Sequence, residues 1–182
     1  PKNNLNFKFI GVLSRLKKED LKKQIDVLVI LSGPEPNRTS LEDKLKKEFK
    51  NDNRNIVFVV GKVEGVQKKW NSEGITFYNY LLTKELQGLI NSSKIVVCRS
   101  GYSSIMDLAI LQKRVFFIPT KNQSEQEYLA NYLEEKGIAP FSEIDDFSKE
   151  KLSEIDKYQG LKTSGTKLDS KLFSFFERKR KF

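Results

Sequence analysis

A short polar turn, RSGYSSIMD, joins an apolar strand pattern to the helix pattern that follows it. The strand ends at Cys98 and the turn begins with Arg99. Its Ser-Gly pair lets a ligand approach the backbone closely, and free amide groups at a helix start attract anions. Arg99 can neutralise phosphate charge, and the carboxylate of Asp107 can accept both hydroxyls of a ribose. Together these residue types suit a nucleotide diphosphate better than a bare metabolite.

Two other turns of similar design follow apolar strand patterns. SGPEPNRTSLED contains Ser32, Gly33 and Arg38, and PTKNQSEQE precedes another helix pattern. In all three turns a hydroxyl stands three residues before an acid, in the pairs Thr39–Glu42, Ser104–Asp107 and Ser124–Glu127. This spacing also predicts a capping box, in which the two side chains satisfy backbone amides at a helix start. The spacing alone leaves both interpretations open, helix capping and ligand binding.

Apolar runs and helical periodicity alternate along the chain and predict the elements that hold these turns. The predicted strands are 25–31, 55–60, 75–78, 94–98 and 114–118. The predicted helices are 40–49, 83–92, 103–111 and 124–136, with one more after Ser148. Residues 62–74 are expected to form a polar loop in which Trp70 has no assigned role.

Strands that are apolar throughout are buried on both faces, and their alternation with helices predicts a parallel sheet between helical layers. The predicted fold is therefore α/β, a Rossmann-like three-layer sandwich. We expect residues 1–24 to form a connector with an entry strand, residues 25–160 a ligand-binding domain, and residues 161–182 a basic amphipathic helix. Ligands of such sheets bind at the carboxyl ends of strands, which is where the three turns fall.

The composition excludes several kinds of chemistry. The chain has no histidine, which excludes histidine catalysis and the usual zinc sites within it, and no metal site is expected. Its single cysteine rules out an internal disulfide and fits a reducing compartment. No apolar run approaches the roughly 20 residues that span a bilayer, and no signal-peptide pattern opens the chain. The formal charge of +9 favours anionic partners.

Three familiar nucleotide-site patterns are absent from the sequence. No GxGxxG follows a strand and no GxxxxGK[ST] occurs, which argues against NAD-dependent and P-loop enzymes. No acid ends a central strand, which argues against a phospho-receiver domain. The basic and aromatic residues are not interleaved as in single-strand binders, so we expect no nucleic-acid partner.

The stretch VVCRSGYSSIMDLAILQKRVFFIPT, followed by QSEQEYLANYLEEKGIA, resembles the C-terminal, donor-binding half of glycosyltransferase family 28. The resemblance covers roughly residues 7–145 and is most specific in 95–138. It implies the C-terminal half of a GT-B fold, in which two Rossmann-like domains enclose the active site and a UDP-sugar donor sits mainly on the C-terminal domain.

The resemblance also assigns roles to individual residues. Asp107 matches a family glutamate that binds the ribose, and Leu82 and Thr83 fall near a backbone site for uracil. Gln126 and Glu127 stand where the family has two glutamines near the donor sugar, so Glu127 departs from the pattern. The complete expected donor site comprises Arg15, Ser32, Gly33, Arg38, Leu82, Thr83, Arg99, Ser100, Gly101, Tyr102, Ser103, Ser104, Asp107, Gln123, Gln126 and Glu127.

The function implied is the donor-binding domain of a glycosyltransferase that transfers a hexose or N-acetylhexosamine to an acceptor, which can be lipid-linked. No cofactor is expected beyond the UDP-sugar substrate. An upstream acceptor-binding domain of the same protein is the expected partner and carries the general base, so this chain alone is expected to be inactive. The expected location is cytoplasmic, with peripheral contact at the inner face of the membrane.

Two other functions stay open at this point. A sugar-nucleotide hydrolase or epimerase shares the architecture, and fold alone does not separate the reactions. A non-catalytic basic binding module or partner subunit is the third interpretation. The last helix carries Phe173, Phe175 and Phe176 beside the basic residues 178–181. Three interpretations stay open for it: docking on the upstream domain, contact with anionic lipid, and a plain terminal helix, and the first two are compatible with each other.

Overall fold

The computed structural model describes residues 11–163 of the chain. The strands are β1 Ile25–Ile30, β2 Ile56–Val59, β3 Lys69–Ser72, β4 Ile75–Tyr78, β5 Ser93–Cys98 and β6 Arg114–Phe117. The helices are α1 Asn37–Phe49, α2 Thr83–Ser92, α3 Tyr102–Ile110 and α4 Ser124–Glu135, followed by a 3₁₀ helix, η1 Lys149–Lys157. The expected terminal helix lies outside the described residues, except for 161–163, which are not helical.

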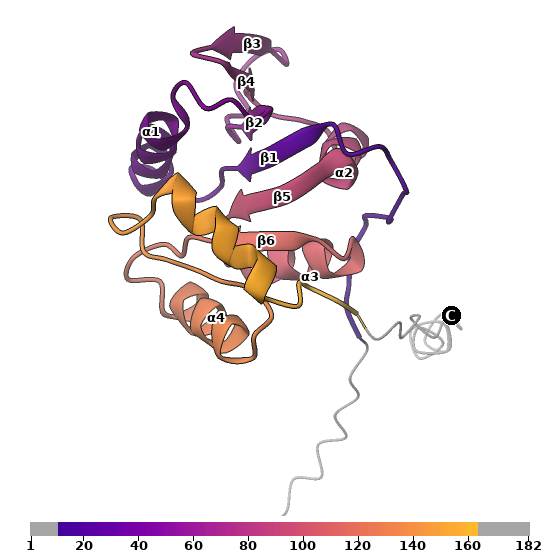
Figure 1. Ribbon diagram of the computed structural model, residues 1–182. Coiled ribbons are helices and arrows are strands. Elements are labelled where there is room, and N and C mark those ends of the chain that lie inside the picture. The colour runs from indigo at the N-terminus through magenta and orange to yellow at the C-terminus, as the bar shows by residue number, and fades with distance from the viewer. Residues whose placement is uncertain (1–10, 164–182) are drawn as a thin grey trace, which may run out of the picture.

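The six strands form one sheet in the order β3-β4-β2-β1-β5-β6. All neighbouring strands are parallel except β3, which runs antiparallel to β4. The chain moves outward from β1 to β2 and β4, and then returns to the other side of β1 to form β5 and β6. The order therefore reverses between β1 and β5, the central arrows in Figure 1. The α/β prediction with a parallel sheet is confirmed.

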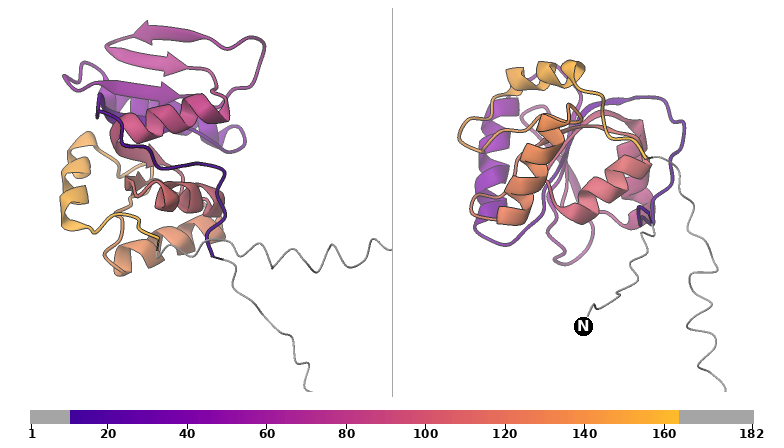
Figure 2. Two further views of the ribbon diagram at one scale, coloured as in Figure 1. Left: turned by 90° about the vertical axis from the view of Figure 1, so that its right-hand side faces the viewer. Right: turned by 90° about the horizontal axis from the view of Figure 1, so that it is seen from below.

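Helices cover both faces of the sheet (Figures 1 and 2). On one face, Leu41, Leu45 and Phe49 of α1 pack with η1 against alternate residues of the strands. On the other face, α2, α3 and the connector residue Leu16 pack against the remaining strand residues. Full burial of a leucine or phenylalanine stabilises the fold by about 1.5–3 kcal/mol. The apolar strands are thus buried on both sides, as their sequence predicts.

Residues 62–74 differ from the predicted polar loop, because they contain the edge strand β3. All four β3 residues are exposed, and Trp70 lies across from Phe77 in the β3–β4 register. The two rings stack with centroids 5.3 Å apart and an interplanar angle of 12°. A polar, exposed edge strand carries neither the continuous apolar run nor the alternation that marks a strand in sequence.

Candidate functional site

The site begins where the strand order reverses, at the adjacent carboxyl ends of β1 and β5. Ile30 and Cys98 are paired there, and their chains then lead to α1 and α3, on opposite faces of the sheet (Figure 1). Such a switch point is the usual ligand crevice of an open α/β sheet. Ser32 and Gly33 follow β1 and are exposed. Gly33 has a φ of 103°, which favours glycine.

The starts of α3 and α4 lie beside each other at this edge. The hydroxyl of Ser100 donates to the backbone carbonyl of Gln126 at 2.7 Å. The side-chain oxygen of Gln126 accepts from the backbone N–H of Thr120 at 3.0 Å, and its nitrogen donates to Gln123. A cavity of about 360 Å³ opens here, lined by Gly101, Asn122, Gln123, Ser124, Glu125 and Gln126. Two helix N-termini therefore contribute to one polar cavity, which favours an anion.

Arg99 lies behind this edge and supplies positive charge without a carboxylate partner among residues 11–163. Its side chain is 4% exposed. Its guanidinium donates to the carbonyls of Pro119 at 2.7 Å, Ile118 at 3.1 Å and Asn37 at 3.0 Å. Burial lowers the pKa of Arg99 to about 10, so the group is charged at neutral pH. Because the Arg99 side chain is buried beneath the edge, it would attract an anion there by electrostatic interaction and not by direct contact.

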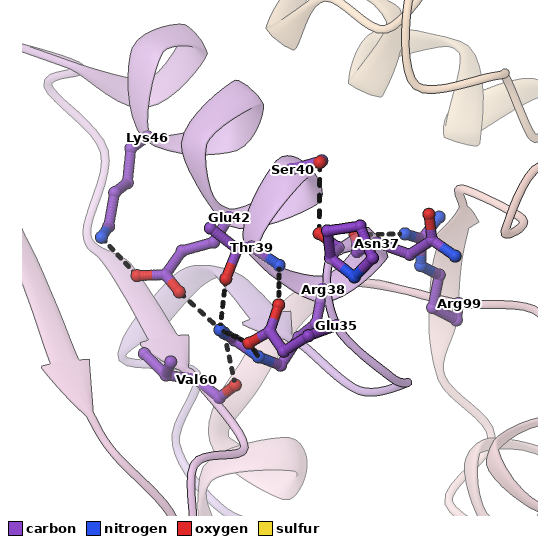
Figure 3. Close-up of polar contacts among 10 residues, drawn as sticks. Glu35, Asn37, Arg38, Thr39, Ser40, Glu42, Lys46, Val60 and Arg99 are labelled. Carbon is purple, nitrogen blue, oxygen red and sulfur yellow. Dashed lines mark hydrogen bonds and ion pairs between the residues drawn. The ribbon is translucent and has the colours of Figure 1, made fainter.

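Arg38 has a different role from the predicted one (Figure 3). Each of its five N–H groups has a protein acceptor, on Glu35 twice, Glu42, Thr39 and the Val60 carbonyl. Glu42 also binds Lys46. The two carboxylates neutralise the guanidinium, and together with Thr39 and the Val60 carbonyl they use all its donors, so none is left for a phosphate. Arg38 fastens the start of α1 to β2 and is not part of the candidate site.

This network also shifts the carboxyl groups that surround Arg38. The hydrogen bond from Arg38 lowers the pKa of the exposed Glu35 carboxyl to about 2. Burial raises the pKa of Glu42, but the bonds from Lys46 and Arg38 outweigh it, and the pKa lies below its ordinary value. Both acids are therefore ionised at neutral pH.

Asp107 lies on the other flank of α3, away from α4. Its Oδ1 accepts a 2.5 Å hydrogen bond from the hydroxyl of Ser14 in the connector. Oδ2 has no hydrogen-bond partner among the described residues and is available to a ligand. Asp107 and Ser104 line a small cavity of about 70 Å³ between α3, α2 and Leu16. Asp107 therefore lies on the α2 side of α3, apart from the α3–α4 cavity.

The three predicted capping boxes are wrong. The helices begin at Asn37, Tyr102 and Ser124, and none has a side-chain cap from the predicted hydroxyl. Asp107 lies in the second turn of α3, too far along to cap it. Glu127 comes nearest to its predicted role, because its carboxylate accepts the backbone N–H of Asn122 at 2.8 Å. In α1 the amide of Thr39 is satisfied instead by Glu35 at 3.1 Å.

The other predicted residues are exposed near the starts of α2 and α3 or in the connector. Tyr102 and Ser103 are exposed on the first turn of α3, and Leu82 is exposed immediately before Thr83 at the start of α2. Arg15 is exposed in the connector, one residue from Ser14. The predicted site therefore divides into a group at the α3–α4 cavity, a group at the α2–α3 flank and the loop after β1.

The sequence interpretation did not identify Ser14, Thr120 and Asn122. Ser14 precedes Arg15 in the segment IGVLSR, but no spacing links it to Asp107, 93 residues away. Thr120 and Asn122 lie in the turn after β6, where the carboxyl-edge rule could have included them.

The described residues contain no group of three or more residues with metal-ligand side chains. Burial raises the pKa of the Cys98 thiol to about 12, so it is not an activated nucleophile. In residues 11–163, no helix combines the length and apolar character needed to cross a membrane.

The family model described as glycosyltransferase family 28 C-terminal domain matches residues 15–167. A UDP-N-acetylglucosamine--N-acetylmuramyl-(pentapeptide) pyrophosphoryl-undecaprenol N-acetylglucosamine transferase from Sulfurihydrogenibium sp. (strain YO3AOP1) is 25% identical over 152 residues, covering 68% of this chain and 43% of that protein. A second transferase, whose name is the same but ends in the number 1, comes from Bacillus thuringiensis (strain Al Hakam). It is 33% identical over 90 residues, covering 48% of this chain and 25% of that protein. The chain spans less than half the length of these relatives.

Solved structures share the fold at low sequence identity. The glycotransferase of kitacinnamycin aligns with a TM-score of 0.59 and 17% identity, over 83% of this chain and 40% of that one. MurG of Acinetobacter baumannii aligns with a TM-score of 0.50 and 15% identity, over 76% of this chain and 41% of that one. These likenesses support the architecture of the sheet and its helices.

Proposed function

The chain belongs to the glycosyltransferase family 28 C-terminal domain, and we propose that it is the donor-binding domain of a glycosyltransferase that uses a UDP-sugar. The observation that carries the proposal is the pair of helix starts, α3 and α4, that meet in one polar cavity at the switch point of the sheet. The relatives are named as N-acetylglucosamine transferases. UDP-N-acetylglucosamine is therefore the donor to test first.

The donor would lie along the carboxyl edge, across the start of α3. The diphosphate oxygens would accept hydrogen bonds from the backbone N–H groups of residues 101–103, and the buried charge of Arg99 would attract the diphosphate from below these residues. The ribose would bind Oδ2 of Asp107, and the uracil would lie beside Leu82 and Thr83 at the start of α2. The sugar would then enter the α3–α4 cavity, where Gln123 and Gln126 can bind its hydroxyls, with Glu127 next to Gln126 outside the lining. Arg15 and Ser32–Gly33 would contact the bound donor from either side of the start of α3.

In the proposed reaction the acceptor oxygen attacks the anomeric carbon and the bond from that carbon to the diphosphate oxygen breaks. The family resemblance implies inversion at that carbon. Negative charge develops on the leaving diphosphate, where the amides of α3 and the buried Arg99 would stabilise it. Proton removal from the acceptor would fall to a base outside this chain.

We further propose that residues 11–24 connect this domain to an acceptor-binding domain of the same protein. The described connector has no helix or strand and crosses α2 and α3, which it contacts through Gln87, Asn91 and Asp107. The acceptor can be lipid-linked, as the relatives' names indicate for those proteins. That chemistry would place the whole protein in the cytoplasm, at the inner face of the membrane.

The first test is thermal stability of the chain with UDP, GDP, CMP and NAD. A ligand at about ten times its Kd stabilises the native state by about 1.4 kcal/mol. We expect a clear rise in Tm with UDP alone, and its loss in Asp107→Asn. The matched control is Asp43→Asn, since Asp43 is an exposed acid on α1 and remote from the edge. No UDP shift in the wild-type chain, or an equal shift in Asp107→Asn, would contradict the proposed site.

A further inference from the structure

A second cavity lies at the opposite edge of the sheet, where β1, β5 and β6 begin. Its volume is about 330 Å³, within the range of roughly 300–1,000 Å³ typical of small-molecule sites. The connector forms one wall through Lys18 and Lys23, and the segment before β6 forms another through Lys113. The strands separate this cavity from the proposed donor site.

Three ammonium groups gather in this cavity. Lys113 is 5% exposed and donates to the backbone carbonyl of Ser93. Lys23 donates to the carbonyl of Asn91, and Lys18 donates to the side-chain oxygen of Gln112 at 2.5 Å. Each ammonium has three N–H donors. After these bonds, every one of the three lysines keeps donors for a further acceptor.

No ion pair within residues 11–163 neutralises these three lysines. The other two cations of the lining are already paired, Lys94 with Asp26 at 2.6 Å and Arg114 with Asp156. The lining acids are Glu19, whose carboxylate accepts from Gln87 at 2.7 Å, and Asp20, which pairs with neither a lysine nor an arginine. The cavity therefore carries an excess of one positive charge, three unpaired lysines against the carboxylates of Glu19 and Asp20.

We propose that Lys18, Lys23 and Lys113 form a phosphate-binding site at this amino edge of the sheet. A phosphate group offers several strong acceptor oxygens and a charge near −2, which matches three convergent ammonium groups. Lysine binds phosphate as a compact point charge, and the side-chain amides of Asn91 and Gln112 add polar groups to the wall. The phosphate belongs either to a free anion or to a lipid head group.

The electrostatics of Lys113 agree with such a site. Burial, with a smaller contribution from the neighbouring charges of Lys23 and Lys18, lowers its pKa to about 8. A positive charge at Lys113 is thus held against both desolvation and repulsion. An anion between the three groups would relieve both effects.

Helix capping is an alternative explanation for these lysines, because lysine side chains often donate to the carbonyls that are left free at the ends of helices. Lys23 and Lys113 each have such a bond, to Asn91 at the end of α2 and to Ser93 after it. One lysine would satisfy each carbonyl without a cavity, and Lys18 bonds to a side-chain oxygen and to no backbone carbonyl. The convergence of the three groups on an open volume is the feature that capping leaves unexplained.

The test is an NMR titration of the ¹⁵N-labelled full chain with inorganic phosphate. The ionic strength is held constant with chloride, and the amides of residues 101–103 report separately on any phosphate bound at the opposite edge. We expect saturable shifts of the Ser93 and Lys113 amides. Affinity should fall at least about tenfold in Lys18→Gln and in Lys113→Met.

Lys17→Gln is the matched control. It removes the same charge from the adjacent residue, whose ammonium does not line the cavity, so affinity should stay within about twofold. Lys18 is exposed, so Lys18→Gln tests the site even if Lys113→Met fails to fold. Shifts that do not saturate, or equal affinity in wild type and Lys18→Gln, would overturn the proposal and leave the lysines as helix caps.

A vesicle arm separates the two sources of phosphate. Co-sedimentation with phosphatidylcholine vesicles containing phosphatidic acid, lost in Lys18→Gln and retained in Lys17→Gln, would assign a lipid head group. Saturable binding of inorganic phosphate without such co-sedimentation would assign a free anion.

Discussion

Arg38 and Arg99 are both 4% exposed and both lie near the start of α1, but their charges are compensated differently. Arg38 is enclosed by carboxylates, whereas Arg99 donates only to backbone carbonyls and its Nε has no partner among the described residues. A buried cation without an acid costs free energy unless something else balances it. That difference makes Arg99 the arginine suited to support an anion, and Arg38 a structural one.

Arg38→Met should lower the free energy of unfolding by about 3 kcal/mol at neutral pH. This loss lies at the low end for a broken buried ion pair, because Glu42 still forms its ion pair with Lys46. The pKa values of Glu35 and Glu42 are depressed in the fold, so their stabilisation is complete above about pH 4.5 and is lost as the pH falls toward 2. The wild type should therefore lose its advantage over Arg38→Met at low pH. Urea denaturation across this range measures the difference.

Lys44→Met is the control for that comparison. Lys44 pairs with Glu48 at 3.3 Å on the same helix, but both side chains are partly exposed, so the loss should stay below about 1 kcal/mol. A wild-type advantage over Arg38→Met that does not change between pH 7 and pH 2 would show that Arg38 acts through packing and not through the two carboxylates.

At the scale of elements, the sequence predicted most of the sheet and its helices because burial leaves a strong pattern. The boundaries of β4 and α2 agree with the prediction, and those of β5, α3 and α4 differ by one residue. α1 begins three residues before its predicted start, at Asn37, in a polar segment without apolar periodicity. Helix starts depend on local backbone geometry and on side chains from elsewhere, which explains why the capping boxes failed.

The sequence predicts at which edge of the sheet the candidate site lies, but not which side chains are free to bind a ligand there. The sequence places polar turns after strands, and the parallel order brings them to one side. It does not reveal which donors are already used. Four of the five Arg38 bonds go to Glu35, Thr39 and Glu42, within four residues of it, and the fifth goes to the Val60 carbonyl just after β2. Asp107 accepts from Ser14 in the connector, 93 residues away.

The β3–β4 pair is the weakest-supported part of the sheet, because β3 is an exposed edge strand. Its main packing contact is the stacked pair of Trp70 and Phe77. Trp70→Ala should lower the free energy of unfolding by about 1 kcal/mol, since an aromatic pair contributes about 0.5–1.5 kcal/mol beyond area burial. Denaturation followed by circular dichroism measures it, with Ser72→Ala on the same strand as a neutral control. A loss no larger than the Ser72→Ala loss would show that the stack does not hold β3.

At the scale of the whole molecule, the proposed donor site occupies one open edge of a single sheet. Transfer needs an acceptor and a base on the far side of the donor sugar. The described acids nearest the α3–α4 cavity are Glu127, whose carboxylate accepts from Asn122, and the exposed Glu125. The chain also spans only 43% of the Sulfurihydrogenibium relative. This coverage suits the proposed domain that binds the donor and relies on a second domain for the acceptor.

We therefore expect the 182-residue chain to bind the UDP-sugar without transferring the sugar. Binding is followed by the rise in Tm, and turnover by UDP release with a lipid-linked acceptor present, in the same sample. A rise in Tm without UDP release is the expected result, because the proposed diphosphate site lies in this chain and the proposed acceptor base lies outside it. UDP release that needs the acceptor and disappears in Glu125→Gln would place the base in this chain. That outcome would contradict the prediction, because one domain would then be enough for transfer and the proposed acceptor-binding domain would not be required.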